Sequence, residues 1–170
     1  MAKAPVVTAD IGQVILDALL ARVATVTQAN GFTADIGRAV FDAMTYEDPL
    51  VAPPPCTLYR ITREQPDNEK QSFIRVKRTI DIAFGWIVKH AGPDPQAVGR
   101  SINADLHQVL IADLSVSAPL EGGGIASIPV DPITEIARTV FPNGPVKGLV
   151  YGQIDLSFPF WTRCENSRRH

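Results

Sequence analysis

The sequence predicts a single sheet-centred α+β domain, and three observations carry that prediction. The segment from Phe73 to about Val88 alternates apolar and polar residues, as a long β-strand does. Two other segments, near residues 11–26 and 95–114, place apolar residues at helical spacing. The composition is typical of globular proteins, since 45% of the 170 residues are hydrophobic and 20% are charged. One domain spanning residues 1–170 is therefore expected, because domains cluster near about 100–150 residues.

The first predicted element is a helix that Thr8 or Asp10 caps at its N-terminus. Asn30-Gly31 supplies a left-handed stop at the other end. The apolar side is broad, so we expect this helix to lie flat on a sheet. The residues of that side are Ile11, Val14, Ile15, Ala18, Leu19, Val23 and Val26.

Residues 33–44 are predicted to form a strand or extended segment. Ile36, Val40 and Met44 would share one side of its pleat, because they lie an even number of residues apart.

A proline-rich connector and a hairpin come next. The run from Pro49 to Pro55 ends in three consecutive prolines, which remove backbone donors and favour an extended left-handed conformation. Cys56 to Arg63 is rich in β-formers and is predicted as a strand. The polar run from Glu64 to Gln71 contains Pro66-Asp67-Asn68 and is predicted as the hairpin loop.

The long strand is too long for one compact subunit. At about 3.3 Å per residue, its sixteen residues would reach roughly 50 Å, whereas a domain of this size has a diameter of about 40 Å. The strand therefore either projects as a hairpin toward another chain or folds back at a bulge near Arg78 or Gly85. Its apolar row, which Arg78 interrupts, is Ile74, Val76, Ile80, Ile82, Phe84, Trp86 and Val88.

A projecting hairpin would carry paired backbone and several side chains to a neighbouring subunit. The candidate subunit-interface residues are Tyr59, Arg60, Phe73, Arg75, Lys77 and Asp81.

A second helix is predicted from Pro95 to about Leu114, after a break at residues 92–95. A flexible glycine hinge follows at residues 122–124. The apolar face of this helix consists of Val98, Ile102, Leu106, Val109, Leu110 and Leu114.

Three more strands complete the expected sheet. Ile125 to Val130 forms a short one, Ile133 to Phe141 a better one, and a tight turn follows at residues 142–145. Gly148 to Trp161 alternates well, with the even positions facing inward. The inward residues are Val150, Ile154, Leu156, Phe158 and Phe160.

Charge and targeting signals narrow the class of protein. The net charge of −2 provides no global field toward nucleic acid or anionic membrane. No apolar run approaches the roughly 18–20 residues of a membrane span, and the N-terminus lacks a signal-peptide pattern. We therefore expect synthesis in a cytoplasm, no membrane partner, and free thiols at Cys56 and Cys164. The ends, about residues 1–7 and 163–170, are expected to be flexible.

No catalytic, cofactor or metal motif stands out. His90, His107 and His170 lack the ligand spacing of a metal site, since Asn103 is a poor ligand beside His107. The triple glycine precedes no Lys-Ser or Lys-Thr, and there is no nucleophile elbow. The prediction is a protein that is not an enzyme and that needs no cofactor or metal.

Basic residues do gather on the predicted hairpin, where they suggest either nucleic acid or a subunit interface. Neighbouring carboxylates, including Glu64 and Asp81, would repel phosphates and so favour the interface. No specific nucleic-acid binding is expected. The basic residues are Arg60, Arg63, Arg75, Lys77 and Arg78.

Several local patterns, in their order along most of the chain, resemble the tail-terminator and minor tail proteins of long-tailed bacteriophages. They are Ala29 to Gly37, Asn103 to Leu106, Ala112 to Leu114 before the glycines, Thr139 to Pro142, and the region from Tyr151 to Phe158.

The resemblance implies a mixed, mostly antiparallel sheet with two helices on one face. It also implies a homo-hexameric ring that caps the tail tube in the virion, after assembly in the host cytoplasm. The implied partners are other copies of the chain, the tail-tube protein, and a neck, connector or head-completion protein. The connector at residues 49–55 and the lengthened hairpin tip depart from shorter relatives.

Other functions stay open at this point. The chain could be another neck or tail-completion protein. It could also be a small ligand-binding or enzymatic α+β domain that uses His90 and His107, or a nucleic-acid module that uses Arg60, Arg75 and Lys77.

Overall fold

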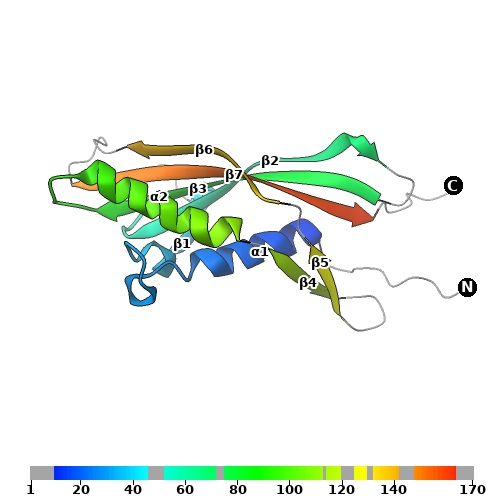
Figure 1. Ribbon diagram of the computed structural model, residues 1–170, viewed down its shortest axis with the longest axis horizontal. Coiled ribbons are helices and arrows are strands. Elements are labelled where there is room, and N and C mark those ends of the chain that lie inside the picture. Colours follow the sequence, from blue (N-terminus) through cyan, green and yellow to red (C-terminus); the bar gives the residue numbers. More distant parts are fainter. Residues whose placement is uncertain are drawn as a thin grey trace, which may run out of the picture.

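The computed structural model describes residues 10–45, 52–71, 75–112, 114–119, 125–129, 132–141 and 148–163. It confirms the α+β fold, with two α-helices and an open five-stranded sheet in the order β1-β2-β3-β7-β6 (Figure 1). Only β1 and β2 are parallel, so the sheet is mixed but mostly antiparallel. The five strands are β1 (Val40–Asp42), β2 (Cys56–Gln71), β3 (Arg75–Lys89), β6 (Thr134–Phe141) and β7 (Leu149–Arg163).

β3 and β7, with 15 residues each, form one uninterrupted ladder. β3 and β7 pair from Arg75 with Arg163 to Lys89 with Leu149, without a register shift. Neither Arg78 nor Gly85 therefore marks a bulge on this side of β3. In Figure 1, β7 lies above β3 at the left end and below it at the right end, which shows the strong twist of the sheet.

One end of this ladder extends beyond the helices. β2, β3 and β7 continue past α1 and α2 at the right of Figure 1. We call this end the limb, and it comprises residues 65–71 of β2, 75–79 of β3 and 159–163 of β7. Of the two outcomes expected for the long strand, the structure shows the projecting one.

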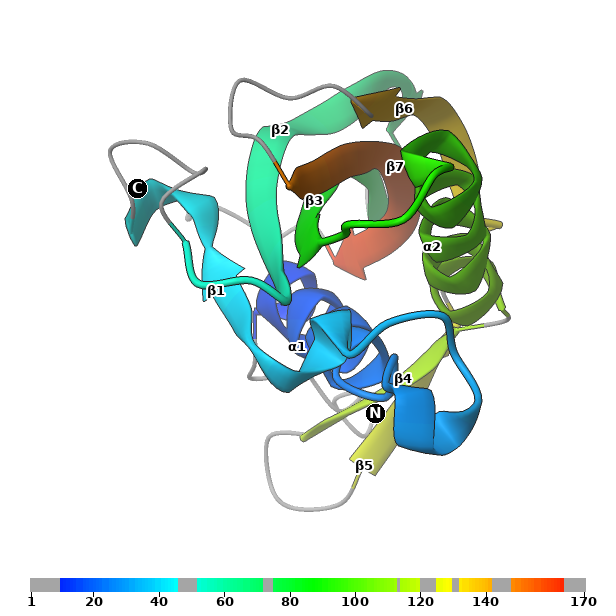
Figure 2. The same ribbon diagram turned by 90° about the vertical axis from the view of Figure 1, so that its left-hand side faces the viewer.

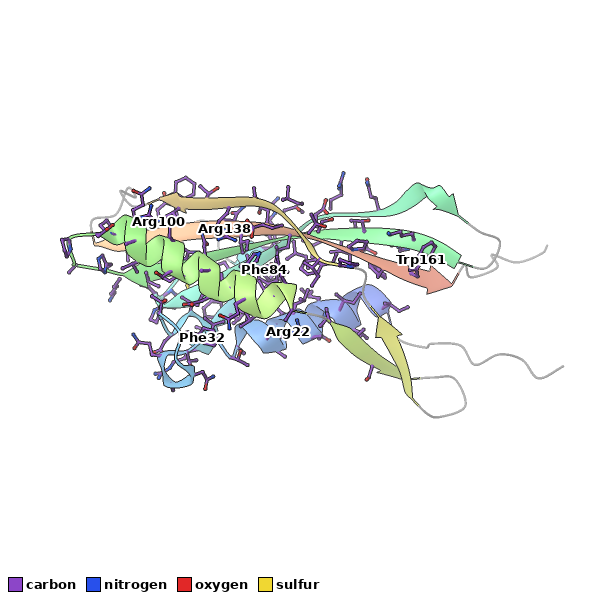
Figure 3. All side chains as sticks on the ribbon, viewed as in Figure 1. Arg22, Phe32, Phe84, Arg100, Arg138 and Trp161 are labelled. Atoms are coloured by element: carbon purple, nitrogen blue, oxygen red, sulfur yellow. The ribbon has the colours of Figure 1, made fainter. Side chains whose placement is uncertain are left out.

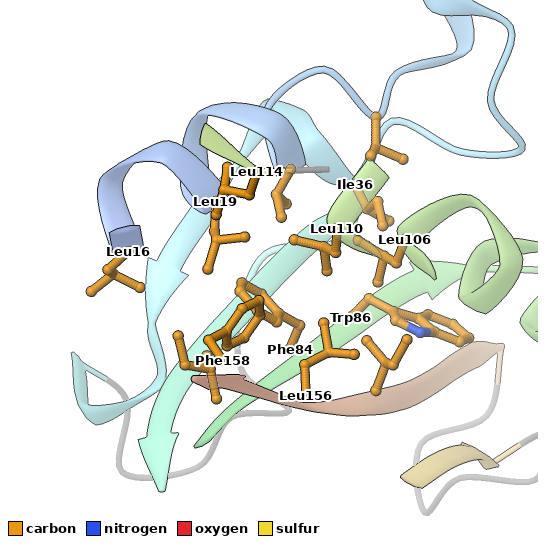
Figure 4. Packing of buried hydrophobic residues seen from close by; sticks show 14 of the residues in the cluster. Leu16, Leu19, Ile36, Phe84, Trp86, Leu106, Leu110, Leu114, Leu156 and Phe158 are labelled. Atoms are coloured by element: carbon orange, nitrogen blue, oxygen red, sulfur yellow. The ribbon is translucent and has the colours of Figure 1, made fainter. Parts of the chain in front are cut away.

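Both helices cover one face of the sheet, as expected (Figure 2). α1 spans Ile11–Val23 and α2 spans Pro95–Ile111. Even-numbered side chains of β3 and β7 pack beneath them, which confirms the inward parity expected for both strands (Figure 4). The strand residues of this core are Ile80, Ile82, Phe84, Trp86, Val88, Val150, Ile154, Leu156, Phe158 and Phe160. Of the expected apolar row, Ile74 and the Val76 side chain lie outside the described residues.

A smaller buried cluster occupies the opposite face of the sheet, which the sequence patterns did not reveal. Ala52, Cys56, Leu58 and Ile87 form its centre, and Tyr151 packs at its margin with other partly buried residues. One end of the sheet is therefore buried on both faces.

The first helix ends earlier than expected. Asp10 caps it by accepting a hydrogen bond from the Gly12 amide at 2.9 Å. It ends at Val23, not at Asn30-Gly31. Gly31 does adopt a left-handed φ of 87°, but it closes a separate 3₁₀ turn at Gln28–Asn30. The chain turns early because Val26 is drawn into the core and its carbonyl accepts the Gly37 amide at 2.8 Å.

The strand predicted for residues 33–44 was largely wrong. Only Val40–Asp42 is a strand, and 3₁₀ turns flank it at Ile36–Arg38 and Ala43–Thr45. Ile36 is buried whereas Met44 is 75% exposed, so the two do not share a side. Part of the hydrogen bonding of this segment comes from a side chain and not from a neighbouring strand, since the Thr33 amide donates to Asp105 Oδ2 at 2.8 Å.

The loop predicted for Glu64–Gln71 was also wrong. Those residues continue β2 to Gln71, and the connection to β3 at residues 72–74 lies outside the described chain. Pro66 stands opposite Arg78 in this ladder. A proline is tolerated there because no described strand pairs with the other side of β2 at this level.

The second helix and the last three predicted strands lie close to where the sequence placed them. α2 is capped by Asp94, which accepts the Ala97 amide at 2.8 Å. It ends before Leu114, although Leu114 is still buried. β5 (Ile125–Pro129), β6 and β7 match the expected strands, whereas β4 (Ser115–Pro119), the partner of β5, was missed. The turns at residues 122–124 and 142–145 lie outside the described residues, and so does the start of the proline-rich connector, residues 49–51. The Pro54–Pro55 bond of the connector is cis.

Candidate subunit interface

The limb extends past the helices, and most of its described side chains are polar. Phe160, at its base, is still buried in the main core near Gly12 of α1. The Lys77 ammonium lies 5.9 Å from the centre of the Trp161 ring, on the neighbouring strand (Figure 3). Arg78 Nη1 lies 3.2 Å from Glu64 Oε1, with both side chains over 40% exposed. Such exposed pairs contribute about 0–1 kcal/mol each. The limb is thus held mainly by its backbone ladder.

Asp81 stands where the limb joins the body of the sheet. Its side chain is only 9% exposed, and it links three strands. Arg63 Nε on β2 donates to Oδ2 at 2.7 Å, and Ser157 Oγ on β7 donates to Oδ1 at 2.7 Å. Both carboxylate oxygens are therefore used within the chain. Asp81 remains an interface prediction, and the geometry gives it a second role in fixing the base of the limb.

Tyr59 is half-buried on the helix-covered face, where its ring packs against the main core. Burial raises the pKa of its phenol, and the carboxylates of Asp42 and Asp17 raise the pKa further. The phenol consequently stays protonated and available as a hydrogen-bond donor.

The other predicted interface residues divide into two groups. Arg60 is exposed on β2, and Lys77 is half-buried beside Trp161. Phe73 and the side chain of Arg75 lie outside what the structure describes. The structure thus brings Arg60, Lys77 and Asp81 onto one face of the sheet, whereas Tyr59 lies on the other.

The basic cluster is partly neutralised, as the sequence led us to expect. Arg63 pairs with Asp81 and Arg78 pairs with Glu64. Arg60 forms no ion pair with another described residue. Arg63 and Arg78 thus have carboxylate partners within the chain, which weakens the case for phosphate binding.

A buried polar contact joins α2 to the sheet, and no sequence pattern assigned it. Trp86 Nε1 donates to Asn103 Oδ1 at 2.7 Å, and Asn103 Nδ2 donates to the Thr139 carbonyl at 3.2 Å. Gly152 leaves room for the indole, because a Cβ there would lie 2.5 Å from the ring. Asparagine is mostly exposed in proteins, so Asn103 next to Ile102 on the apolar face of the helix is the one sequence signal that could have revealed the contact.

No reactive grouping appears in the described part of the chain. Among those residues, no three His, Cys, Asp or Glu side chains cluster closely enough to hold a metal ion. His107 lies on the surface of α2, where Nε2 is 3.3 Å from Glu135 Oε2. His90 is half-buried, and its Nε2 has no hydrogen-bond partner in the described structure.

The buried thiol is also poorly suited to chemistry. Cys56 is fully buried, and desolvation raises its pKa to about 11. It therefore stays in the unreactive thiol form at neutral pH. Cys164 and His170 lie outside the described residues. None of the described helices is long and apolar enough to cross a membrane.

Comparison with known proteins gave matches among solved structures only. No protein-family model matches the chain, and no curated protein does. Among solved structures, the chain is similar to one from the virion of a native gene transfer agent particle. The two are 18% identical, the match covers 88% of this chain and 97% of that chain, and the TM-score is 0.47.

Proposed function

We propose that this chain is a structural protein of a tailed-bacteriophage virion, a tail terminator. Copies of it form a closed ring, a hexamer, on the end of the tail tube and join the tube to the neck. The partners are further copies of the chain, the tail-tube protein and a neck, connector or head-completion protein. The protein acts through the shape of its interfaces and not through catalysis.

One observation carries this proposal: the sheet is longer than the helices that cover it. Past Phe160, the last β7 side chain that packs in the main core, β2, β3 and β7 continue as the limb with no helix over them. A sheet normally buries one face against another layer. An uncovered three-stranded limb with paired backbone is explained most simply by a neighbouring subunit that supplies the missing layer.

Two further observations agree with a structural role. The order of sequence patterns resembles that of tail-terminator proteins over most of the chain. The described residues also lack clustered metal ligands, and their buried cysteine is held in the thiol form. These features favour assembly over an enzymatic or ligand-binding function.

A ring of such subunits would end tube growth by geometry. Its lower surface would repeat the contacts that one layer of tube makes with the next. Its upper surface would differ, so that no further layer is added and a neck protein binds instead. Heterologous contacts between identical subunits close into a ring when the rotation between neighbours allows it.

The decisive experiment is to locate the chain in the particle. Virions carrying an affinity tag at the C-terminus of this chain are imaged by cryo-electron microscopy, with untagged virions as the control. We expect a single ring of tagged density at the head-tail junction. Tagged density elsewhere in the neck would make the chain a different neck protein, and particles without the chain would refute the proposal.

The mass of the purified protein provides a second test. Native mass spectrometry should detect a species with six times the 18.4 kDa mass of the chain. A different closed ring would correct the symmetry and leave the function standing.

A further inference from the structure

Two edges of the five-stranded sheet are open in the described part of the chain. β6 has no described strand on its outer side along Thr134–Phe141. β2 has none beyond Tyr59, where its short ladder with β1 ends. An open edge presents backbone N–H and C=O groups that readily pair with another strand.

Each open edge carries one exposed aliphatic side chain. Ile136 on β6 is 57% exposed, and Ile61 on β2 is 43% exposed. They are two of only four large hydrophobic side chains that are exposed among the described residues. A single exposed isoleucine needs no explanation. On β6 the exposed Phe141 ring stacks on Tyr151, whereas Ile136 and Ile61 are the exposed aliphatic side chains of the two open edges.

Both edges are also bulged close to the isoleucine: the unpaired residue is Ile136 itself on β6 and Thr62, next to Ile61, on β2. The register shifts between Ile61 and Arg63 on β2, and between Glu135 and Ala137 on β6. Bulges and charges on an edge discourage indiscriminate strand addition. A strand that joins either edge must therefore match a particular local shape.

The charges on the two edges are compatible with each other. β6 carries Glu135 and Arg138, and β2 carries Arg63 and Glu64. Each edge thus has both signs at its surface, so two such edges can meet with opposite charges facing. An edge of one sign would instead repel its own copy.

The two edges of one chain cannot satisfy each other. In Figure 1, β6 runs along the end of the sheet that α2 covers, whereas the open part of β2 leads into the limb at the opposite end. A partner for either edge must come from another molecule.

We propose that β6 of one copy pairs with β2, beyond Tyr59, of a second copy. The sheet then continues from one subunit into the next, and Ile136 and Ile61 become buried at the junction. The inference rests on the proposed function in one respect, which is that the partner is another copy of this chain.

Two single variants test the pairing, because each damages one edge and leaves the other intact. Ile136→Asp places a charge on β6, and Ile61→Asp places one on β2. Both positions are exposed, so the fold should persist, as circular dichroism will check. Met44→Asp is the matched control, since Met44 is exposed at 75% and lies on neither edge.

Self-association is measured by sedimentation velocity over a range of concentrations. Each edge variant alone should self-associate at least about tenfold more weakly than the wild type, a loss of roughly 1.4 kcal/mol. An equimolar mixture of the two should form one-to-one dimers, because the intact β6 of one variant meets the intact β2 of the other. Met44→Asp should assemble like the wild type.

Three results would overturn the pairing. They are a wild type that stays monomeric, an edge variant that assembles like the wild type, and a mixture that stays monomeric. Failure of the proposed function looks different: the chain would self-associate through these edges and yet be missing from the head-tail junction.

Discussion

The body and the limb of the sheet share the same strands, yet they are held together differently. In the body, Trp86 and Phe84 of β3 are buried beneath α2 and α1, and Ile87 is buried on the other face. In the limb, Lys77 and Arg78 of the same strand are only partly buried or exposed. The alternation of side chains is unchanged between the two. What differs is the layer above the sheet, so strand pattern alone does not determine how much a strand contributes to stability.

The largest difference in stability between body and limb is expected when one tryptophan is replaced in each region. Trp86→Ala should lower the free energy of unfolding by about 3–5 kcal/mol, because it removes a fully buried side chain. Trp161→Ala, in the limb, should cost less than about 1 kcal/mol in the isolated subunit. Urea denaturation followed by circular dichroism measures both. Equal losses would show that the limb is packed within its own subunit.

A pH titration probes the body through Cys56. Its pKa is raised from 9.0 to about 11, so the folded state holds the thiol proton more tightly than the unfolded state. The resulting stability is fully present below pH 9 and is lost as the pH rises through 11. The loss is at most roughly 2–3 kcal/mol. Cys56→Ala should unfold with a flatter pH dependence between pH 9 and pH 11, and identical profiles would contradict the burial of this thiol.

The polar contact inside the body should have a smaller effect than its tryptophan. Asn103→Leu leaves the Trp86 indole N–H without its acceptor and should cost about 1–3 kcal/mol. Trp86→Phe removes that donor, so in the double variant the two losses should not add. Full additivity in denaturant unfolding would show that the hydrogen bond contributes nothing.

Removing the Asp81 side chain, where the body joins the limb, should lower the free energy of unfolding less than the core substitutions do. Asp81→Ala removes the acceptor of Arg63 and Ser157 and should destabilise the fold by about 1–2 kcal/mol, since the Arg63 side chain is 55% exposed. Glu64→Ala, which breaks the exposed pair with Arg78, should change stability by less than about 1 kcal/mol. A larger loss from Glu64→Ala than from Asp81→Ala would reverse the order that burial predicts.

The strands and helices that could be predicted from the sequence are those in which apolar residues recur at a short, regular spacing. β3 and β7 follow from period-two alternation, and their inward parity holds at Phe84 and Phe158. The first helix is capped by Asp10, one of the two caps that the sequence offered, and the second begins at Pro95, as predicted. The length of the long strand left two outcomes open, a projecting hairpin or a bulge, and the uninterrupted ladder with β7 decided for projection. Local pattern is sufficient in these places because the periodic residues all face one continuous core.

Only the tertiary structure decided the features that depend on a distant partner. β2 runs to Gln71 because β3 supplies a ladder for residues whose local composition favours a loop. α1 stops at Val23 because the core takes up Val26 in another conformation. Asn103 is buried because Trp86, from another element, pairs with its oxygen, and Asp81 turns inward to Arg63 and Ser157. In each case the deciding contact is made with another element of the fold, about which the spacing of neighbouring residues carries no information.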